Sequence, residues 1–176
     1  QGTLQVHYEF QSLVCQLTGM EVANAGMYDG STALAEAALM AARITRCNGV
    51  AVMSTVSPAY RQVIETYTQA PGLDIYAVSS EQPDLKEGTA CLIVQQPSFL
   101  GYMEDMAALS ERAHSQGALL VVSADPMSLA MFRPPGDYDA DIVVGEGQTL
   151  GVVPAFGGPY VGIFACKQKH VRQMPG

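Results

Sequence analysis

Apolar residues recur at helical spacing in four segments, and most of these segments also carry the end signals of a helix. The pattern predicts helices over residues 3–18, 33–46, 58–69 and 102–115. The helix over 33–46 has the strongest signal, because Ala and Leu dominate it and both have high helix propensity. Gly19 and Gly117 stand where two of the helices end, and Ser57-Pro58 opens a third with an N-cap and a proline in the first turn.

Six shorter apolar runs, rich in Val, Ile and Leu, alternate with these helices. Turn-forming residues bound them, as is typical of strands buried on both faces. The runs are residues 50–53, 74–78, 90–94, 118–122, 141–144 and 161–165. This alternation predicts an α/β fold, with a largely parallel mixed sheet flanked by helices. Because no internal repeat, low-complexity tract or linker is visible, residues 1–176 are expected to form a single domain.

One segment, residues 145–160, breaks the alternation. It contains five glycines and two prolines, a composition that does not form a regular element. A loop that follows the carboxyl end of a strand in an α/β sheet is where ligands usually bind. The alternative is a long surface turn in which the glycines only allow tight bends between two strands. We interpret the segment as a wall of a ligand site.

Composition and charge exclude several classes of protein. The 176 residues are 48% hydrophobic and 15% charged, which is inconsistent with intrinsic disorder. No apolar run approaches the ~20 residues that span a bilayer, so we expect no membrane segment. The net charge of −8 disfavours nucleic-acid binding, because that affinity comes from clustered Lys and Arg. Without Cys-x-x-Cys pairs, or histidines at metal-ligand spacing, we expect free thiols, a cytoplasmic location and no metal site.

Two local patterns are candidates for holding an anionic cofactor. In the first, Gly30, Ser31 and Thr32 precede the Ala-rich helix, where backbone N–H groups and the helix dipole favour phosphate. Helix capping by Asp29 or Ser31 would explain the same residues. In the second, Asp125 follows a buried strand, and a carboxylate there can pair with the ring nitrogen of pyridoxal phosphate. Spacing alone favours a simple cap at Asp125 as well.

Four stretches of the chain together resemble one known family. They read QGTLQ at the start, ANAGMYDGSTALAEAALMA, ADIVVGEGQTLGVVPAFGGPYVGIFA, and RQMPG at the close. They are similar to the glycine cleavage system P-proteins, the decarboxylating glycine dehydrogenases, and most similar to subunit 1 of the two-chain form. The resemblance covers essentially all 176 residues. It implies the large, cofactor-binding domain of a fold type I pyridoxal-phosphate enzyme, as a fragment of a longer chain whose small carboxyl-terminal domain is absent here.

The resemblance implies a reaction in which glycine loses its carboxylate and the aminomethyl group passes to a lipoyl carrier protein. Pyridoxal phosphate is the electron sink in that chemistry, and a lysine must hold it as a Schiff base. In the catalytic subunit this lysine follows the strand equivalent to Asp141–Val144, whereas this chain has Gly147-Gln148-Thr149 there. We therefore expect no catalytic residue in this chain, and a cofactor held mainly by the lysine-bearing subunit 2.

The same resemblance assigns places to the candidate residues. Gly30, Ser31 and Thr32 correspond to the phosphate turn and Asp125 to the aspartate at the ring nitrogen; alternatively, they hold the loop or face the partner subunit. The residues expected at the subunit interface or in the active-site loop are Tyr28, Asp29, Gln148, Gly157 and Gly158. Expected partners are subunit 2, the lipoyl carrier H-protein and glycine, with self-association through uncovered apolar surface. The alternative function is a non-catalytic scaffold or regulatory homologue.

Overall fold

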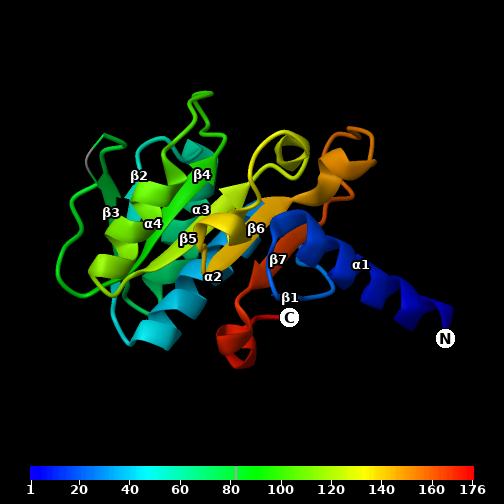
Figure 1. Ribbon diagram of the computed structural model, residues 1–176, viewed down its shortest axis with the longest axis horizontal. Coiled ribbons are helices and arrows are strands. Elements are labelled where there is room, and N and C mark those ends of the chain that lie inside the picture. Colours follow the sequence, from blue (N-terminus) through cyan, green and yellow to red (C-terminus); the bar gives the residue numbers. More distant parts are fainter. Residues whose placement is uncertain (82) are drawn as a thin grey trace.

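A seven-stranded mixed sheet forms the centre of the molecule in this computed structural model, which describes residues 1–81 and 83–176. The strand order is β1-β7-β6-β5-β4-β2-β3 (Figure 1). Five neighbouring strands are parallel: β2 (Gly49–Met53), β3 (Asp74–Val78), β4 (Thr89–Gln96), β5 (Leu119–Ala124) and β6 (Ile142–Glu146). β7 (Gly162–Cys166) is antiparallel to β6, and the short β1 (Val22–Ala23) is antiparallel to β7. The prediction of a largely parallel mixed sheet is confirmed.

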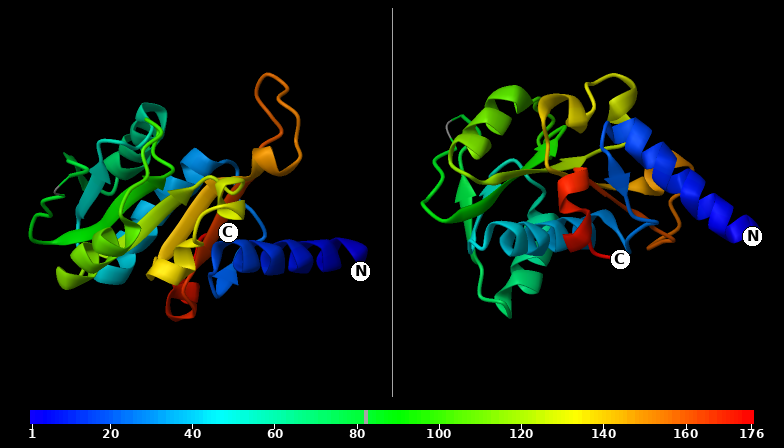
Figure 2. Two further views of the ribbon diagram at one scale, coloured as in Figure 1. Left: turned by 45° about the horizontal axis from the view of Figure 1, so that its top comes forward. Right: turned by 60° about the horizontal axis from the view of Figure 1, so that its bottom comes forward.

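Helices cover both faces of this sheet, which explains why its central strands are apolar along their whole length. α2 (Gly30–Thr45) and α3 (Pro58–Gln69) lie on one face, and α4 (Met106–Ser115) lies on the other (Figure 2). α2 packs against β4, β5, β6 and β7, and most of its alanine side chains are fully buried there: Ala33, Ala35, Ala37, Ala38 and Ala41. All residues of β5 and β7 are buried. The predicted doubly covered sheet is therefore present.

α1 (Gly2–Thr18) is placed differently from the other helices. It extends away from the body, with its amino end far from the sheet, and packs at its carboxyl end near β1 and β7 (Figure 1). Gly19 ends it in a left-handed conformation, with φ 68°, as the sequence predicts for the residue after this helix. Apolar side chains on α1 remain exposed: Leu4, Val6, Tyr8 and Leu13. None of the helices in the described ranges combines the length and the apolar character needed to cross a bilayer.

Two predicted helix boundaries are wrong. α2 begins at Gly30, three residues before the predicted start, because Asp29 is its N-cap. The helix expected over residues 102–115 begins at Met106, because Asp105 caps it by accepting a hydrogen bond from the backbone N–H of Ala108 at 3.1 Å. Tyr102 and Met103, whose apolar side chains fit the helical pattern, lie instead in the loop after β4 and are exposed. The remaining short elements are 3-10 turns: η1 (Ser128–Ala130), η2 (Pro135–Tyr138), η3 (Gly147–Leu150) and η4 (Gln168–Gln173).

The carboxyl ends of the parallel strands meet along one edge of the sheet, which we call the carboxyl edge. The loops after β4, β5 and β6 leave the sheet at this edge, and the loop after β6 projects farthest (orange in Figure 2, left). The amino end of α2 also reaches the carboxyl edge. Most residues singled out from the sequence are therefore gathered at one end of the molecule, where ligands bind in α/β sheets.

Candidate functional site

The turn before α2 is fixed against β7 by two backbone hydrogen bonds. The N–H of Met27 donates to the carbonyl of Gly162 at 2.8 Å, and the N–H of Gly162 donates to the carbonyl of Met27 at 2.9 Å. A Cβ atom at Gly162 would lie 2.4 Å from the carbonyl oxygen of Asp29, so glycine is required for this close approach. This packing brings Asp29 and Gly30 beside the end of β6.

Asp29 is the N-cap of α2. Its carboxylate accepts hydrogen bonds from the N–H of Thr32 at 2.7 Å, from the hydroxyl of Thr32 at 2.8 Å and from the hydroxyl of Ser31 at 2.9 Å. Partial burial alone would raise the pKa of Asp29, but these hydrogen bonds outweigh it and hold the pKa below its ordinary value. The capping interpretation of this turn is therefore confirmed for Asp29.

A second carboxylate, from Glu146 at the end of β6, also reaches the start of α2. Its Oε2 accepts from the N–H of Gly30 at 2.9 Å, and its Oε1 accepts from the N–H groups of Gln148 at 2.9 Å and Val161 at 3.3 Å. The ring of Tyr60 packs nearby, and its pKa is raised to about 12 by burial and then by the charges of Glu146 and Asp29. Sequence reasoning missed Glu146, because nothing local links it to a residue 116 positions away.

These contacts decide whether the turn suits the phosphate of a pyridoxal cofactor. The N–H groups of Gly30 and Thr32 already donate to protein carboxylates, so a phosphate there would meet two negative charges. The residues present therefore do not fit the phosphate at this turn.

The lysines of the chain lie at the opposite edge of the sheet. Lys86 precedes β4 and pairs with Asp74 at the start of β3, at 3.3 Å. Lys167 and Lys169 follow β7. Because β7 is antiparallel to β6, it ends at the edge of the sheet opposite the carboxyl edge, which we call the amino edge. At the carboxyl edge, Gly147 and Gln148 occupy the place where a cofactor lysine is expected. This chain therefore offers no lysine for covalent attachment there.

Asp125 lies at the carboxyl edge, directly after β5, and its side chain is exposed. Its Oδ1 accepts from the N–H of Met127 at 3.0 Å, and its carbonyl accepts from the hydroxyl of Ser128 at 2.6 Å. These contacts shape the turn that leads into η1. A contact between Asp125 and a cofactor ring stays a prediction.

Three of the residues expected at the interface line one small cavity. Tyr28, Gly157 and Gly158 surround a space of about 260 Å³ together with Met27, Pro159 and Tyr160. Gly157 and Gly158 have φ values of 121° and 129°, a conformation that L side chains rarely adopt. The loop also exposes the whole side chain of Phe156. The fold thus places the turn before α2 against the far part of the glycine-rich loop.

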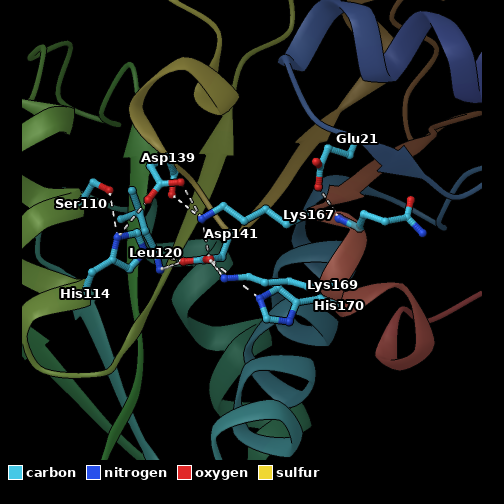
Figure 3. A network of polar contacts seen from close by, with 10 residues as sticks. Glu21, Ser110, His114, Leu120, Asp139, Asp141, Lys167, Lys169 and His170 are labelled. Atoms are coloured by element: carbon cyan, nitrogen blue, oxygen red, sulfur yellow. Dashed lines mark hydrogen bonds and ion pairs between the residues drawn. The ribbon is translucent and has the colours of Figure 1, made fainter.

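Sequence reasoning also missed a polar network at the amino edge, centred on Asp141 (Figure 3). The Asp141 side chain is 1% exposed and accepts from His114 Nε2 at 2.6 Å, Lys167 Nζ at 2.8 Å and the N–H of Leu120 at 3.0 Å. Burial alone would raise the pKa of Asp141, but the hydrogen bonds from Lys167, His114 and Leu120 together hold it below its ordinary value. Asp139 adds a second carboxylate, 2.8 Å from Lys167 Nζ.

The fold defines the class of protein. The structure is similar to cystathionine gamma-lyase from Lactobacillus plantarum, with a TM-score of 0.76, 16% identity, and coverage of 95% of this chain and 44% of that one. At that identity the likeness concerns the fold alone, and the fold is that of the fold type I pyridoxal-phosphate enzymes. The expected fold class is confirmed.

Closer comparisons give the family. The family model described as Glycine cleavage system P-protein matches residues 1–176. A crystal structure of glycine decarboxylase (P-protein) of the glycine cleavage system, in inhibitor-bound form, superposes with a TM-score of 0.95 at 46% identity. The superposition covers 100% of this chain and 41% of the glycine decarboxylase chain. The chain belongs to the glycine cleavage system P-protein family, as its motifs indicate.

Curated relatives agree with this assignment. A protein of Desulforamulus reducens, named "Probable glycine dehydrogenase (decarboxylating) subunit 1", is 49% identical over 185 residues. A protein of the same name from Thermomicrobium roseum is 51% identical over 189 residues. In both cases the match covers 100% of this chain and 42% of the relative, so the chain spans less than half the length of these relatives.

Proposed function

We propose that this chain is part of subunit 1 of a glycine decarboxylase that turns over glycine only when it is paired with a lysine-bearing subunit 2. Membership of the P-protein family supports the reaction, and the name of its relatives supports the division into subunits. Pyridoxal phosphate, when bound in the complex, supplies the electron sink for loss of the glycine carboxylate. Because no lysine of this chain lies at the carboxyl edge, subunit 2 holds the cofactor.

The observation that supports this division most directly is the occupied turn at the start of α2. Glu146 and Asp29 take the N–H groups of Gly30 and Thr32, and Gln148 lies where the lysine would be. Both attachment points of the cofactor are therefore unsuitable in the same chain. The role left for this chain is to shape the site from across the subunit interface.

The glycine-rich loop is the part of this chain that we place at the shared site. It projects from the carboxyl edge (Figure 2, left). Its Gly157 and Gly158 line one cavity with Tyr28. Gln148, Asp29 and the exposed Asp125 lie at the same edge of the sheet. In this role the loop excludes water from the site and positions glycine, while the lipoyl carrier H-protein receives the aminomethyl group. We also place the complex in the cytoplasm.

Reconstitution tests this function. The full-length subunits are purified separately and assayed alone and mixed for exchange of the glycine carboxyl group with labelled bicarbonate. Exchange should require the mixture and should rise with subunit 1 until the stoichiometric ratio is reached. Exchange by subunit 2 alone at the rate of the mixture would refute the proposed role of this chain.

Two loop variants test whether the loop belongs to the site. Gly157→Val places a branched side chain at a backbone position with φ 121°, and Gln148→Ala removes the side chain at the position of the lysine. Both should lower the exchange rate by at least about tenfold while the complex still assembles. This fall corresponds to a loss of ~1.4 kcal/mol of transition-state stabilisation. Glu65→Gln, an exposed change on α3, is the control. Normal exchange by both assembled variants would mean that the loop is a structural turn.

The absence of a lysine at the carboxyl edge also fits a second candidate function, a non-catalytic scaffold that only stabilises subunit 2. A scaffold would raise the amount or thermal stability of active subunit 2 without changing its rate per active complex. The two functions therefore differ in kcat, and the loop variants separate them: a scaffold tolerates both, and a subunit that shapes the site does not.

A further inference from the structure

Glu146 connects three segments that are far apart in the sequence. Its carboxylate accepts from Gly30 at the start of α2, from Gln148 at the start of the glycine-rich loop and from Val161 at its end. Capping of the short turn η3 accounts for the bond to Gln148 alone. The bonds to Gly30 and Val161 join positions 116 and 15 residues away, which local capping does not require.

The two ends of the loop meet at this carboxylate. The N–H of Gly147 donates to the carbonyl of Val161 at 2.7 Å, and Glu146 pairs with Gly162 in the β6–β7 ladder. The loop is therefore closed at its base, like the compact surface loops whose ends lie side by side. Glu146 extends this closure by binding both ends of the loop to α2.

Few hydrogen bonds hold the loop to the body. Within residues 1–81 and 83–176, no hydrogen bond joins residues 153–160 to another segment, and the side-chain bonds that tie residues 147–161 to the sheet come from Glu146, the last residue of β6. Gln148 makes its own side-chain contact with the carbonyl of Val152, inside the loop. The direction in which residues 153–160 leave the sheet is therefore set at the base, where Glu146 acts.

We propose that Glu146 is a positioning residue for the glycine reaction: it fixes the glycine-rich loop to the amino end of α2, so that the loop forms its wall of the shared site. This proposal rests on the function proposed above. Glu146 does not touch the reacting atoms; it acts through the backbone of the loop. The carboxylate is required because it accepts three hydrogen bonds on two oxygens, whereas a glutamine has one acceptor oxygen and a donating NH₂ group.

The experiment uses full-length subunit 1, paired with subunit 2, carrying Glu146→Gln. Glu146→Asp, which keeps the charge and shortens the reach, is a second variant in case the first fails to assemble, and Glu65→Gln is the matched control on the exposed side of α3. Hydrogen–deuterium exchange followed by mass spectrometry reports on the backbone N–H groups of Gly30, Gln148 and Val161. Glycine–bicarbonate exchange gives kcat and the KM for glycine per assembled complex.

We expect the amides of the loop base to exchange about ten- to a hundredfold faster in Glu146→Gln, because each loses a bond to a charged acceptor. We expect kcat to fall by about tenfold or more while the melting temperature stays close to that of Glu65→Gln. A purely structural role of Glu146 would not lower kcat per assembled complex without also lowering the melting temperature. Unchanged amide exchange in the loop would overturn the proposal, as would a loosened loop with normal kcat. Failure of the proposed function is distinguishable, because subunit 2 alone would then exchange glycine at the rate of the mixture, or Gly157→Val and Gln148→Ala would both exchange normally, whatever Glu146→Gln does.

Discussion

Replacing Asp141 by Asn should destabilise the protein by about 3 kcal/mol at neutral pH. The Asp141 carboxylate is buried and accepts hydrogen bonds from His114, Lys167 and the N–H of Leu120. Removing one member of a buried ion pair typically costs about 3–5 kcal/mol, because the partner charge is left without compensation. The lower end of that range applies here, because Asp139 remains 2.8 Å from Lys167 Nζ and the Lys167 side chain is 19% exposed.

The effect should depend on pH with a definite sign. Hydrogen bonds hold the pKa of Asp141 in the folded protein below its ordinary value. The carboxylate therefore contributes its full stabilisation above the pKa of an unfolded Asp, about 3.9, and loses it as the pH falls below that value. The difference between the unmodified protein and Asp141→Asn should be complete at pH 7 and should shrink below about pH 4.

Urea denaturation of full-length subunit 1, followed by circular dichroism at pH 7 and pH 3.5, measures this difference. Asp137→Asn is the matched control, since Asp137 is exposed and its carboxylate makes no hydrogen bond or ion pair within the described part of the chain. If Asp141→Asn is no less stable than Asp137→Asn at pH 7, the buried network does not hold the strands and helices together as its geometry indicates. A difference that persists unchanged at pH 3.5 would contradict the assigned pKa direction.

Three further predictions concern the cofactor, the packing of the site and the thiols. Full-length subunit 1 without its partner should gain no pyridoxal adduct after incubation with the cofactor and borohydride reduction; a stoichiometric adduct in the intact mass would refute this. Gly162→Ala should destabilise the protein by about 1–3 kcal/mol or more, because its Cβ would lie 2.4 Å from the carbonyl oxygen of Asp29. The control Gly2→Ala, with open space around the new Cβ, should leave stability unchanged, and equal melting temperatures of the two variants would contradict the packing. Burial raises the pKa of the Cys91 and Cys166 thiols to about 12, so a thiol reagent at pH 8 should leave both unlabelled until the protein is denatured, as peptide mass spectrometry can check. Labelling of Cys91 as fast as the partly exposed Cys47 would be the contrary result.

The fold follows closely from local patterns in the sequence. Runs of Val, Ile and Leu mark the strands because helices cover both faces of the sheet, so their residues need no polar alternation. The alanines of α2 mark a helix that must lie close to several strands of the sheet. The start of α4 could not be read in the same way: Tyr102 and Met103 continue the apolar pattern, and the cap at Asp105 decides the boundary.

The polar contacts of the site follow much less from the sequence. The cap at Asp29 is local, and the sequence offers it as an alternative to phosphate binding. The bond from Glu146 to Gly30 and the contacts of Asp141 with His114 and Lys167 join residues 116, 27 and 26 positions apart. Such pairs become neighbours only through the order of the strands, which no local pattern specifies.

The antiparallel pairing of β6 and β7 has a consequence for how this family can diversify. Because the loop leaves the sheet at Glu146 and returns at Gly162, directly opposite, its two ends are already together before it closes. Doubling the length of such a loop costs only about 0.6 kcal/mol in closure entropy. Insertions and deletions between these two positions can therefore alter the shape of this surface while the register of the sheet stays fixed.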